Sequence, residues 1–410
     1  MSAVTHQKFN APRFYCDYGN FVQASGQKHS DYITGNEVSL VNIDTGEELP
    51  QNELSQLGIS NSNAYKITSL TPTIPTLFKV QDRSEALRFK FWTLSENESF
   101  FMINYIAILC HNLKNAEAFA IAYIENDEGQ QLLGSNPIIN SSLLPTEIFR
   151  ASENDNGTTI CDLYGTEDWS TDSGEGTTSS SSNANGKIGF EDKATYERFA
   201  LSGNTLVIEI RPIYSTFFSD ITIGSISYGR YIDMPYSPDV NITEEISYEG
   251  VDRAKTLGGA NVSNIKYTGS PKWNYDISMN EFIEPFSCSR RKDILRNGRR
   301  SWDLEYSSLF NYHLQSPNLD LSDSFQSNDL YNQLILKTLN GQLPFILETS
   351  TETYTFTDQN NYDNKDFNVV KYNEHMPQNF FISRLEDNTY SQERVQGNLY
   401  STSMKIVESW

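Results

Sequence analysis

Short runs in which apolar and polar residues alternate dominate this sequence. Residues 87–91 are Leu-Arg-Phe-Lys-Phe, and residues 206–210 are Leu-Val-Ile-Glu-Ile. This period of two indicates strands with one buried face. Further short apolar runs, bounded by Gly, Pro, Asn, Asp or Ser, occur at 118–124, 221–228, 302–306, 343–347 and 403–407. The pattern predicts an all-β fold of two β-sandwich or jelly-roll-like domains.

Helical periodicity is rare in the sequence. Residues 329–339 place Leu330, Leu334, Ile335 and Leu339 at helical spacing, and a shorter candidate covers residues 287–297. Neither segment is long enough to dominate a domain, so we expect few and short helices.

The chain length allows two to three domains, because single cores stop growing near about 250 residues. Turn signals gather between Pro235 and Pro271, where strong periodicity lapses. Residues 169–186, WSTDSGEGTTSSSSNANG, are almost free of apolar side chains and predict a mobile loop inside a domain. We therefore expect four parts, namely an N-terminal arm at 1–29, a jelly-roll domain at 30–240, a linker at 241–274, and a β-rich domain at 275–410.

The charge balance narrows the choice of partner. The 410 residues include 31 Lys and Arg against 53 Asp and Glu, a net charge of −22. A chain this acidic is repelled by nucleic acids and by anionic membrane surfaces, so neither is expected as a partner. The longest apolar run, around residues 105–109, is too short to cross a membrane, and the first residues lack a secretory signal.

Motifs of catalysis and of cofactor binding are missing from the sequence. No two of the five His residues have the i, i+4 spacing of a helical metal site, and no nucleophile elbow, dinucleotide fingerprint or P-loop is present. We therefore predict no catalytic residue, no cofactor and no metal site. A glycoside hydrolase needs only two carboxylates at a suitable separation, which the sequence cannot reveal, so that alternative stays open.

Cys110 directly precedes His111 within an apolar run. Adjacent side chains of a strand point to opposite faces, so the two cannot form a thiolate–imidazolium pair there. The pattern predicts a core cysteine beside a histidine that faces away from the core.

One local cluster of cations contrasts with the acidic chain. Six Lys and Arg residues lie within residues 290–300, shortly before Trp302. Arg binds carboxylates through two parallel hydrogen bonds and, like aromatic residues, is enriched at protein interfaces. The alternative is a solvated charged stretch whose cations balance nearby carboxylates of the same fold. Trp410 is expected to pack against its own domain or a neighbour. The candidate subunit interface therefore comprises Arg290, Arg291, Arg296, Arg299, Arg300, Trp302 and Trp410.

Several segments, taken in order, resemble virion structural proteins of tailed bacteriophages. Residues 104–123 carry His111-Asn112-Leu113, and residues 223–240 carry the Gly-Arg-Tyr and Met-Pro-x-Ser-Pro segment that closes the same domain in those proteins. The parts that resemble the C-terminal domain are GRRSWDLEYSSL at 298–309, LPFILE at 343–348 and NLYSTSMKIVESW at 398–410.

The first two segments bracket a region similar to galactose-binding-like jelly rolls. The resemblance implies a non-enzymatic virion protein of the tail or baseplate, assembled in the host cytoplasm as a homo-oligomer with other virion proteins as partners. Fold alone does not fix function. The alternatives are a receptor-binding tail protein, whose exposed aromatic residues stack on a host surface glycan, and a polysaccharide depolymerase that uses paired carboxylates.

Overall fold

The computed structural model describes most of the predicted strands. The described residues are 12–24, 37–72, 74–92, 105–125, 131–132, 146–150, 157–162, 205–235, 237–239, 243–247, 251–265, 299–315, 329–349, 355–357, 369–371, 380–387 and 389–409.

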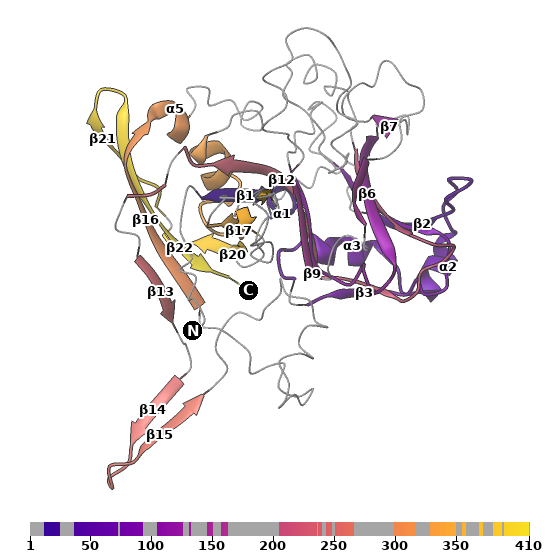
Figure 1. Ribbon diagram of the computed structural model, residues 1–410, viewed down its shortest axis with the longest axis horizontal. Coiled ribbons are helices and arrows are strands. Elements are labelled where there is room, and N and C mark those ends of the chain that lie inside the picture. The colour runs from indigo at the N-terminus through magenta and orange to yellow at the C-terminus, as the bar shows by residue number, and fades with distance from the viewer. Residues whose placement is uncertain are drawn as a thin grey trace, which may run out of the picture.

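One ten-stranded antiparallel sheet runs through both halves of the chain (Figure 1). Its order is β13-β16-β22-β20-β17-β1-β12-β5-β9, and β21 pairs with β22 beside this path. The strands are β1 (Arg13–Asp17), β5 (Tyr105–His111), β9 (Gly157–Asp162), β12 (Ser225–Asp233), β13 (Thr243–Ser247), β16 (Arg299–Phe310), β17 (Phe345–Glu348), β20 (Phe380–Leu385), β21 (Gln392–Gln396) and β22 (Leu399–Glu408).

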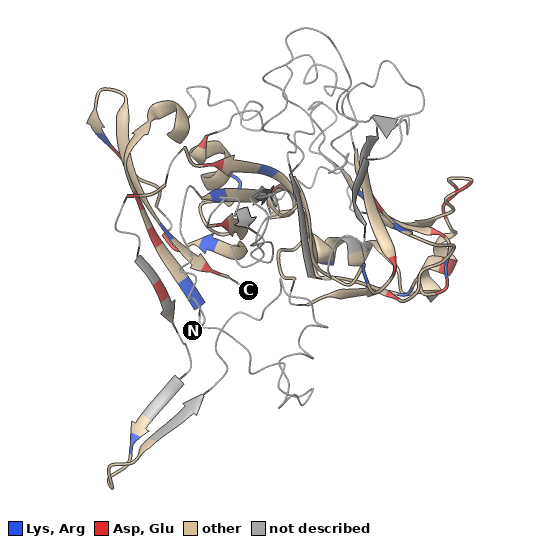
Figure 2. Cartoon of the chain, in the orientation of Figure 1, with Lys and Arg blue, Asp and Glu red and all other residues tan. Residues whose placement is uncertain are grey.

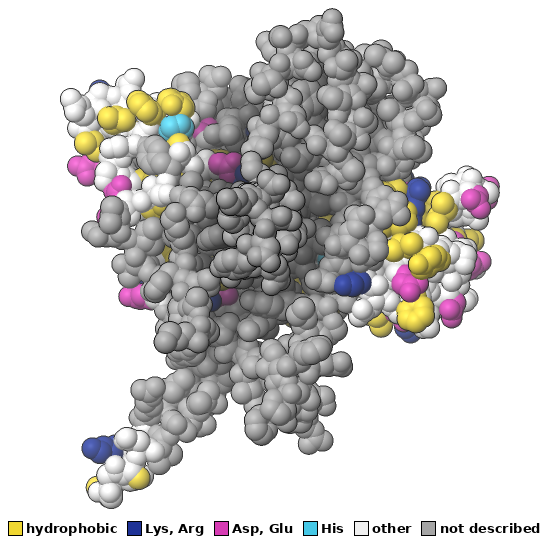
Figure 3. Space-filling view, viewed as in Figure 1, with side chains coloured by type: hydrophobic (Ala, Val, Ile, Leu, Met, Phe, Trp, Pro, Cys, Tyr) yellow, Lys and Arg dark blue, Asp and Glu magenta, His cyan; other side chains and the backbone are white. Residues whose placement is uncertain are grey.

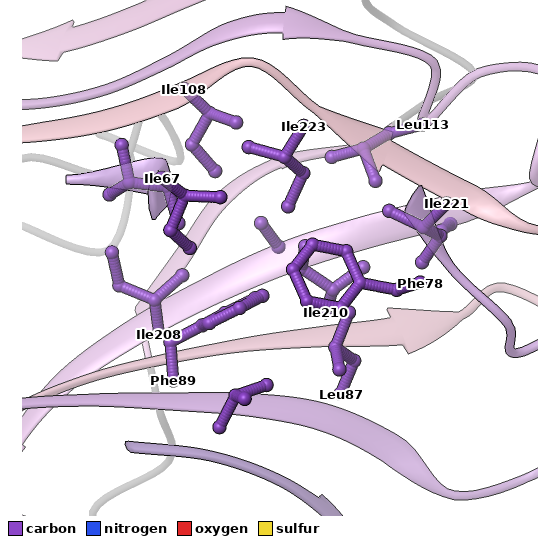
Figure 4. Packing of buried hydrophobic residues seen from close by; sticks show 14 of the residues in the cluster. Ile67, Phe78, Leu87, Phe89, Ile108, Leu113, Ile208, Ile210, Ile221 and Ile223 are labelled. Carbon is purple, nitrogen blue, oxygen red and sulfur yellow. The ribbon is translucent and has the colours of Figure 1, made fainter. Parts of the chain in front are cut away.

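A six-stranded sheet packs against β5 and β12 of the large sheet and closes a sandwich. Its strands are β2 (Glu37–Val41), β4 (Ala86–Trp92), β6 (Ala118–Glu125), β7 (Gln131–Leu132), β8 (Thr146–Arg150) and β10 (Thr205–Pro212). Figure 4 shows Phe89 and Ile208 of this sheet facing the same core as Ile108 of β5. The buried apolar face predicted from the alternation in 87–91 and 206–210 is thereby confirmed.

The register of β4 and β10 explains the polar positions of those strands. Phe89 pairs with Ile208 in the core, and the neighbouring pair on the other face is Arg88 with Glu209. Arg88 Nε donates to Glu209 Oε1 at 2.7 Å, and Arg211 holds the other oxygen of this buried carboxylate. A buried charge is tolerated because both of its oxygens are bonded to cations.

Small elements complete the fold. The remaining strand pairs are β3 (Thr76–Phe78) with β11 (Ile221–Ile223), β14 (Val251–Lys255) with β15 (Asn261–Ile265), and β18 (Thr355–Thr357) with β19 (Val369–Lys371). The helices are α1 (Tyr18–Ala24), α2 (Gln51–Gln56), α3 (Asn61–Ile67), α5 (Asn311–Leu314) and the π-helix η5 (Tyr331–Ile335). Within the described ranges, no helix is long and apolar enough to cross a membrane.

The second half of the chain has its own core on one face of the large sheet. Trp302, Leu304 and Tyr306 alternate along β16 and point into this core, while Asp303 and Glu305 between them are exposed. An antiparallel sheet commonly has one face on a core and one face in water, and β16 and β22 follow that rule.

The fold class agrees with the sequence pattern, since the structure is all-β with few short helices. The helix predicted at 329–339 is present in part, as the π-helix η5. The predicted loop at 169–186 and the predicted helix at 287–297 lie outside the described residues.

The domain organisation differs from the predicted one at two places. Within the predicted N-terminal arm, β1 and α1 are built into the fold, and β1 lies between β12 and β17. Within the predicted linker at 241–274, β13 pairs with β16, and β14 forms a hairpin with β15. Gly258 and Gly259, two of the signals that predict a linker, lie in the turn of this hairpin.

Candidate functional site

The strand β1 forms a seam between the two halves of the chain. It pairs with β12 of the first half through five residues and with β17 of the second half through three. Because successive strand residues point to opposite faces, Phe14 and Cys16 enter the core of the second half. The other three residues, Arg13, Tyr15 and Asp17, share the opposite face.

An aromatic and polar network surrounds Tyr15 on that opposite face. Its ring packs edge-on against Tyr105 of β5, with the centroids 4.9 Å apart, and it also contacts Phe380 of β20. The Tyr15 hydroxyl donates to Glu348 Oε2 at 3.0 Å. These contacts join strands from both halves in one buried cluster, so the seam holds the halves together through side chains as well as through the backbone.

Arg13 lies at one end of this network and contacts Asp233 and Tyr231 of β12. Its Nη2 donates to Asp233 Oδ2 at 3.0 Å, and its guanidinium lies 3.9 Å from the ring centroid of Tyr231. The guanidinium group is thereby placed between a carboxylate and an aromatic face, a combination that suits Arg better than Lys.

Asp17 lies at the other end of β1, where the strand meets α1. Its Oδ1 accepts a hydrogen bond from the backbone N–H of Asn20 at 2.7 Å, which stabilises the first turn of α1. The carboxyl group is buried near Ser227, whose hydroxyl is 2.9 Å from the hydroxyl of Tyr105. Burial raises the pKa of Asp17 to about 7, because the charged form loses its hydration.

A glycine makes room for the chain at this point. Gly229 of β12 pairs with Asp17, and a Cβ at Gly229 would lie 2.1 Å from the carbonyl oxygen of Cys16. No other residue fits without a backbone shift.

The opposite face of the seam carries a second buried polar contact. The Tyr18 hydroxyl of α1 donates to Gln333 Oε1 of η5 at 3.1 Å. The ammonium group of the buried Lys337 lies 4.8 Å from the ring centroid of Phe21. The π-helix of the second half is thereby attached to the first helix of the chain.

Several ionisable groups at the seam are buried, and burial changes their pKa values. Desolvation raises the pKa values of Cys16 and Tyr18 as well as that of Asp17, so burial favours the uncharged form of each group. In the part of the chain that the structure describes, no group of three or more His, Cys, Asp or Glu could hold a metal ion.

The predicted subunit interface is placed only in part. Trp302 is 1% exposed and packs against Phe381 with ring centroids 4.9 Å apart. This corrects the expectation that Trp302 forms a contact surface, because its position on β16 points it into the core. Arg299 and Arg300 are half-buried, and the Arg300 guanidinium lies over the Phe381 ring. The other predicted interface residues, Arg290, Arg291, Arg296 and Trp410, lie outside the described residues.

The Cys110–His111 pair is arranged differently from the prediction. His111 is buried and Cys110 is half-buried, because the strand register shifts at this point and Cys110 adopts a φ of 53°. The N–H of Leu113 donates to His111 Nδ1 at 3.4 Å. A β-bulge thus exchanges the expected sides of the two residues.

Charged and apolar side chains are unevenly distributed over the outer strands. Figure 2 shows carboxylates on β13 and β16, where Glu245, Asp303 and Glu305 are exposed. At the far end of β16, the partly exposed rings of Phe310 and Tyr312 stack with their centroids 5.5 Å apart. Figure 3 shows hydrophobic side chains gathered at that end of the molecule.

Comparisons with known proteins add little. No family model matches the chain, and no curated protein matches it. Among solved structures, a mutant of xylanase 10C from Cellvibrio japonicus in complex with xylopentaose aligns with 12% identity and a TM-score of 0.22. The alignment covers 48% of this chain and 27% of the xylanase chain. At this TM-score, the similarity supports no conclusion about fold or activity.

Proposed function

We propose that this chain is a non-enzymatic structural component of a tailed-phage virion, located in the tail or baseplate. It acts through contacts with copies of itself and with other virion proteins, and it assembles in the host cytoplasm. The proposal starts from the segments in both halves of the sequence that resemble virion proteins and follow one another in the same order.

The observation that carries the proposal is the seam. One sheet continues from β9 to β13 through β1, so a load applied to one half is transmitted to the other through backbone hydrogen bonds. Two side-chain hydrogen bonds between ionisable groups hold the seam, from Arg13 to Asp233 and from Tyr15 to Glu348, and Tyr18 adds a third to Gln333. Such a junction suits an assembly subunit whose two ends contact different neighbours.

The test is to search for the chain in purified particles. Particles banded by density and washed at high salt are digested and analysed by quantitative mass spectrometry. The proposal predicts peptides of this chain in a fixed ratio to other virion proteins in every preparation. Finding the chain only in the soluble fraction of the lysate contradicts the proposal.

A second candidate is glycan binding by the first half of the chain. Tyr214 and Phe218 are 69% and 67% exposed on one loop, whose Ile213 and Phe218 N–H groups donate to Glu117 and Ala116. Exposed aromatic rings on a fixed loop can stack on sugar rings. A glycan array tests this candidate: binding lost on Tyr214→Ala and kept in Tyr65→Ala, an exposed ring on α3, supports it. An array without any bound glycan contradicts it.

A further inference from the structure

The β14–β15 hairpin stands apart from both sheets. It pairs with no third strand within the described ranges, and Figure 1 shows it projecting from the body of the molecule. Its turn is well formed, since Thr256 N donates to Ala260 O at 2.9 Å and Ala260 N donates to Thr256 Oγ1 at 3.0 Å. Isolated two-stranded hairpins are at best marginally stable in water, so this hairpin lacks a stabilising surface within the described part of its own chain.

The tip of the hairpin is fully accessible. Residues 254–261 are all exposed, and Leu257 at the tip is the most exposed large hydrophobic side chain of the described residues. An apolar side chain at the tip of a projecting hairpin contributes no burial to the fold of its own chain. Covering it with a second surface removes its apolar area from water, which favours binding.

Charge complementarity favours a second copy of this chain as that surface. The exposed residues 254–261 contain the cation Lys255 and no carboxylate, whereas the whole chain carries a net charge of −22. The open face of β13 and β16 presents Glu245, Asp303 and Glu305. Lys405 of the neighbouring β22 lies opposite Asp303 and forms an ion pair with Glu386, so the face keeps an excess of carboxylates. A cationic arm is drawn to such a face.

The arm does not lie on this face of its own chain. In Figure 1 the hairpin points away from β13 and β16, which carry the carboxylates. A contact between the arm of one copy and the open face of the next is heterologous, and repeated heterologous contacts generate rings or filaments.

We propose that the β14–β15 hairpin is a docking arm that binds the acidic face of β13 and β16 on a second copy of this chain. This inference deepens the proposed function, on which it rests, by naming the contact through which copies meet. In the complex, Leu257 is covered, and Lys255 pairs with Asp303 or Glu305 of the second copy.

Sedimentation velocity of the purified full-length chain over a concentration series tests the arm. Leu257→Asp and Lys255→Glu are each expected to weaken self-association about tenfold or more, since a buried anchor or a paired charge is lost. The matched controls are Leu77→Asp and Lys79→Glu on and beside β3, whose side chains are also exposed. Both controls should associate as the unmodified chain does.

A charge exchange tests the receiving face. Adding Asp303→Lys to Lys255→Glu places opposite charges on the two partners again, so the double variant should regain part of the association lost by Lys255→Glu. Far-UV circular dichroism and the urea midpoint should stay unchanged in every variant, because the substituted side chains lie outside the cores.

The inference is overturned if the arm variants associate as tightly as the unmodified chain, or if the double variant associates no better than Lys255→Glu. It is also overturned if the unmodified chain stays monomeric at all concentrations. A monomer whose hairpin amides become protected from hydrogen exchange only when other virion proteins are added points to a different occupant and also overturns it. None of these results changes whether the chain is found in purified particles, so the proposed function fails or stands on its own test.

Discussion

The buried carboxyl group of Asp17 gives the sharpest test of the seam. The pKa of this group rises from its ordinary 3.8 to about 7 on folding, because burial removes the hydration of the charged form. Between these two values the folded chain keeps a proton that the unfolded chain has lost. Stability therefore falls as pH rises through this window, and the loss is complete above the folded pKa.

The size of the effect follows from the shift. Each pKa unit corresponds to about 1.4 kcal/mol, so the shift of roughly three units lowers the free energy of unfolding by about 4 kcal/mol above pH 7. Asp17→Asn removes the ionisation and keeps an oxygen that can accept from the Asn20 N–H. The variant should therefore be more stable than the unmodified chain at pH 8, and its advantage should shrink by about 2 kcal/mol at pH 5.5.

Urea unfolding followed by tryptophan fluorescence measures the free energy of unfolding of the variant and of the unmodified chain at pH 5.5 and at pH 8. The quantity of interest is how much their difference changes between the two pH values. Asp44→Asn, at an exposed turn, is the matched control and should show an equal effect at both pH values within about 0.5 kcal/mol. The reasoning is refuted if Asp17→Asn also shows equal effects at both pH values. It is refuted as well if the variant loses stability relative to the unmodified chain as pH rises.

Two further substitutions test the packing of the second core and of the seam. Trp302→Ala should lower the free energy of unfolding by about 3–5 kcal/mol, whereas Tyr312→Ala at an exposed ring should change it by less than about 1 kcal/mol; equal effects in urea unfolding would show that Trp302 is not in the core. Gly229→Ala should lower the free energy of unfolding by more than about 2 kcal/mol or leave the chain insoluble, because the added Cβ meets the Cys16 carbonyl oxygen. In the control Gly258→Ala the added Cβ meets only Thr256 Oγ1 at 4.0 Å, so this variant should unfold at the same urea concentration as the unmodified chain. A Gly229→Ala variant as stable as the unmodified chain contradicts the seam geometry.

Local patterns predicted the strands well where apolar side chains gather on one face. The alternation at 206–210 gave β10 because Leu206, Ile208 and Ile210 enter the core, although the other face of the strand is buried as well. The alternation near Trp302 gave β16 for the same reason, but the neighbouring cations suggested a contact surface. The direction of a side chain depends on its place in the period, and Trp302 shares its period with Leu304 and Tyr306, which should have placed it in the core.

The seam could not be predicted, because its cause is not local. All five residues of β1 are buried, so the strand lacks the one-sided alternation that marks β16 and β22. Its partners lie more than 200 residues away in β12 and more than 300 residues away in β17. A sequence of five residues contains no information about pairings at such distances, and the raised pKa of Asp17 follows from those pairings.

The bulge at Cys110 shows a further limit. Strict alternation placed Cys110 in the core and His111 on the other side, and one residue with positive φ reversed this arrangement. Asn112 signals the turn that follows, but Cys110 itself is neither glycine nor a turn residue, so the bulge was not predicted. The face of a strand on which a side chain lies can therefore be assigned only when the pairing register of that strand is known.

A cryo-EM reconstruction of the purified particle tests the proposed virion role of this chain. We expect repeated copies of the ten-stranded sheet in the tail or baseplate, each with β1 between β12 and β17. Particles whose proteins are all assigned without any density for this sheet would contradict it.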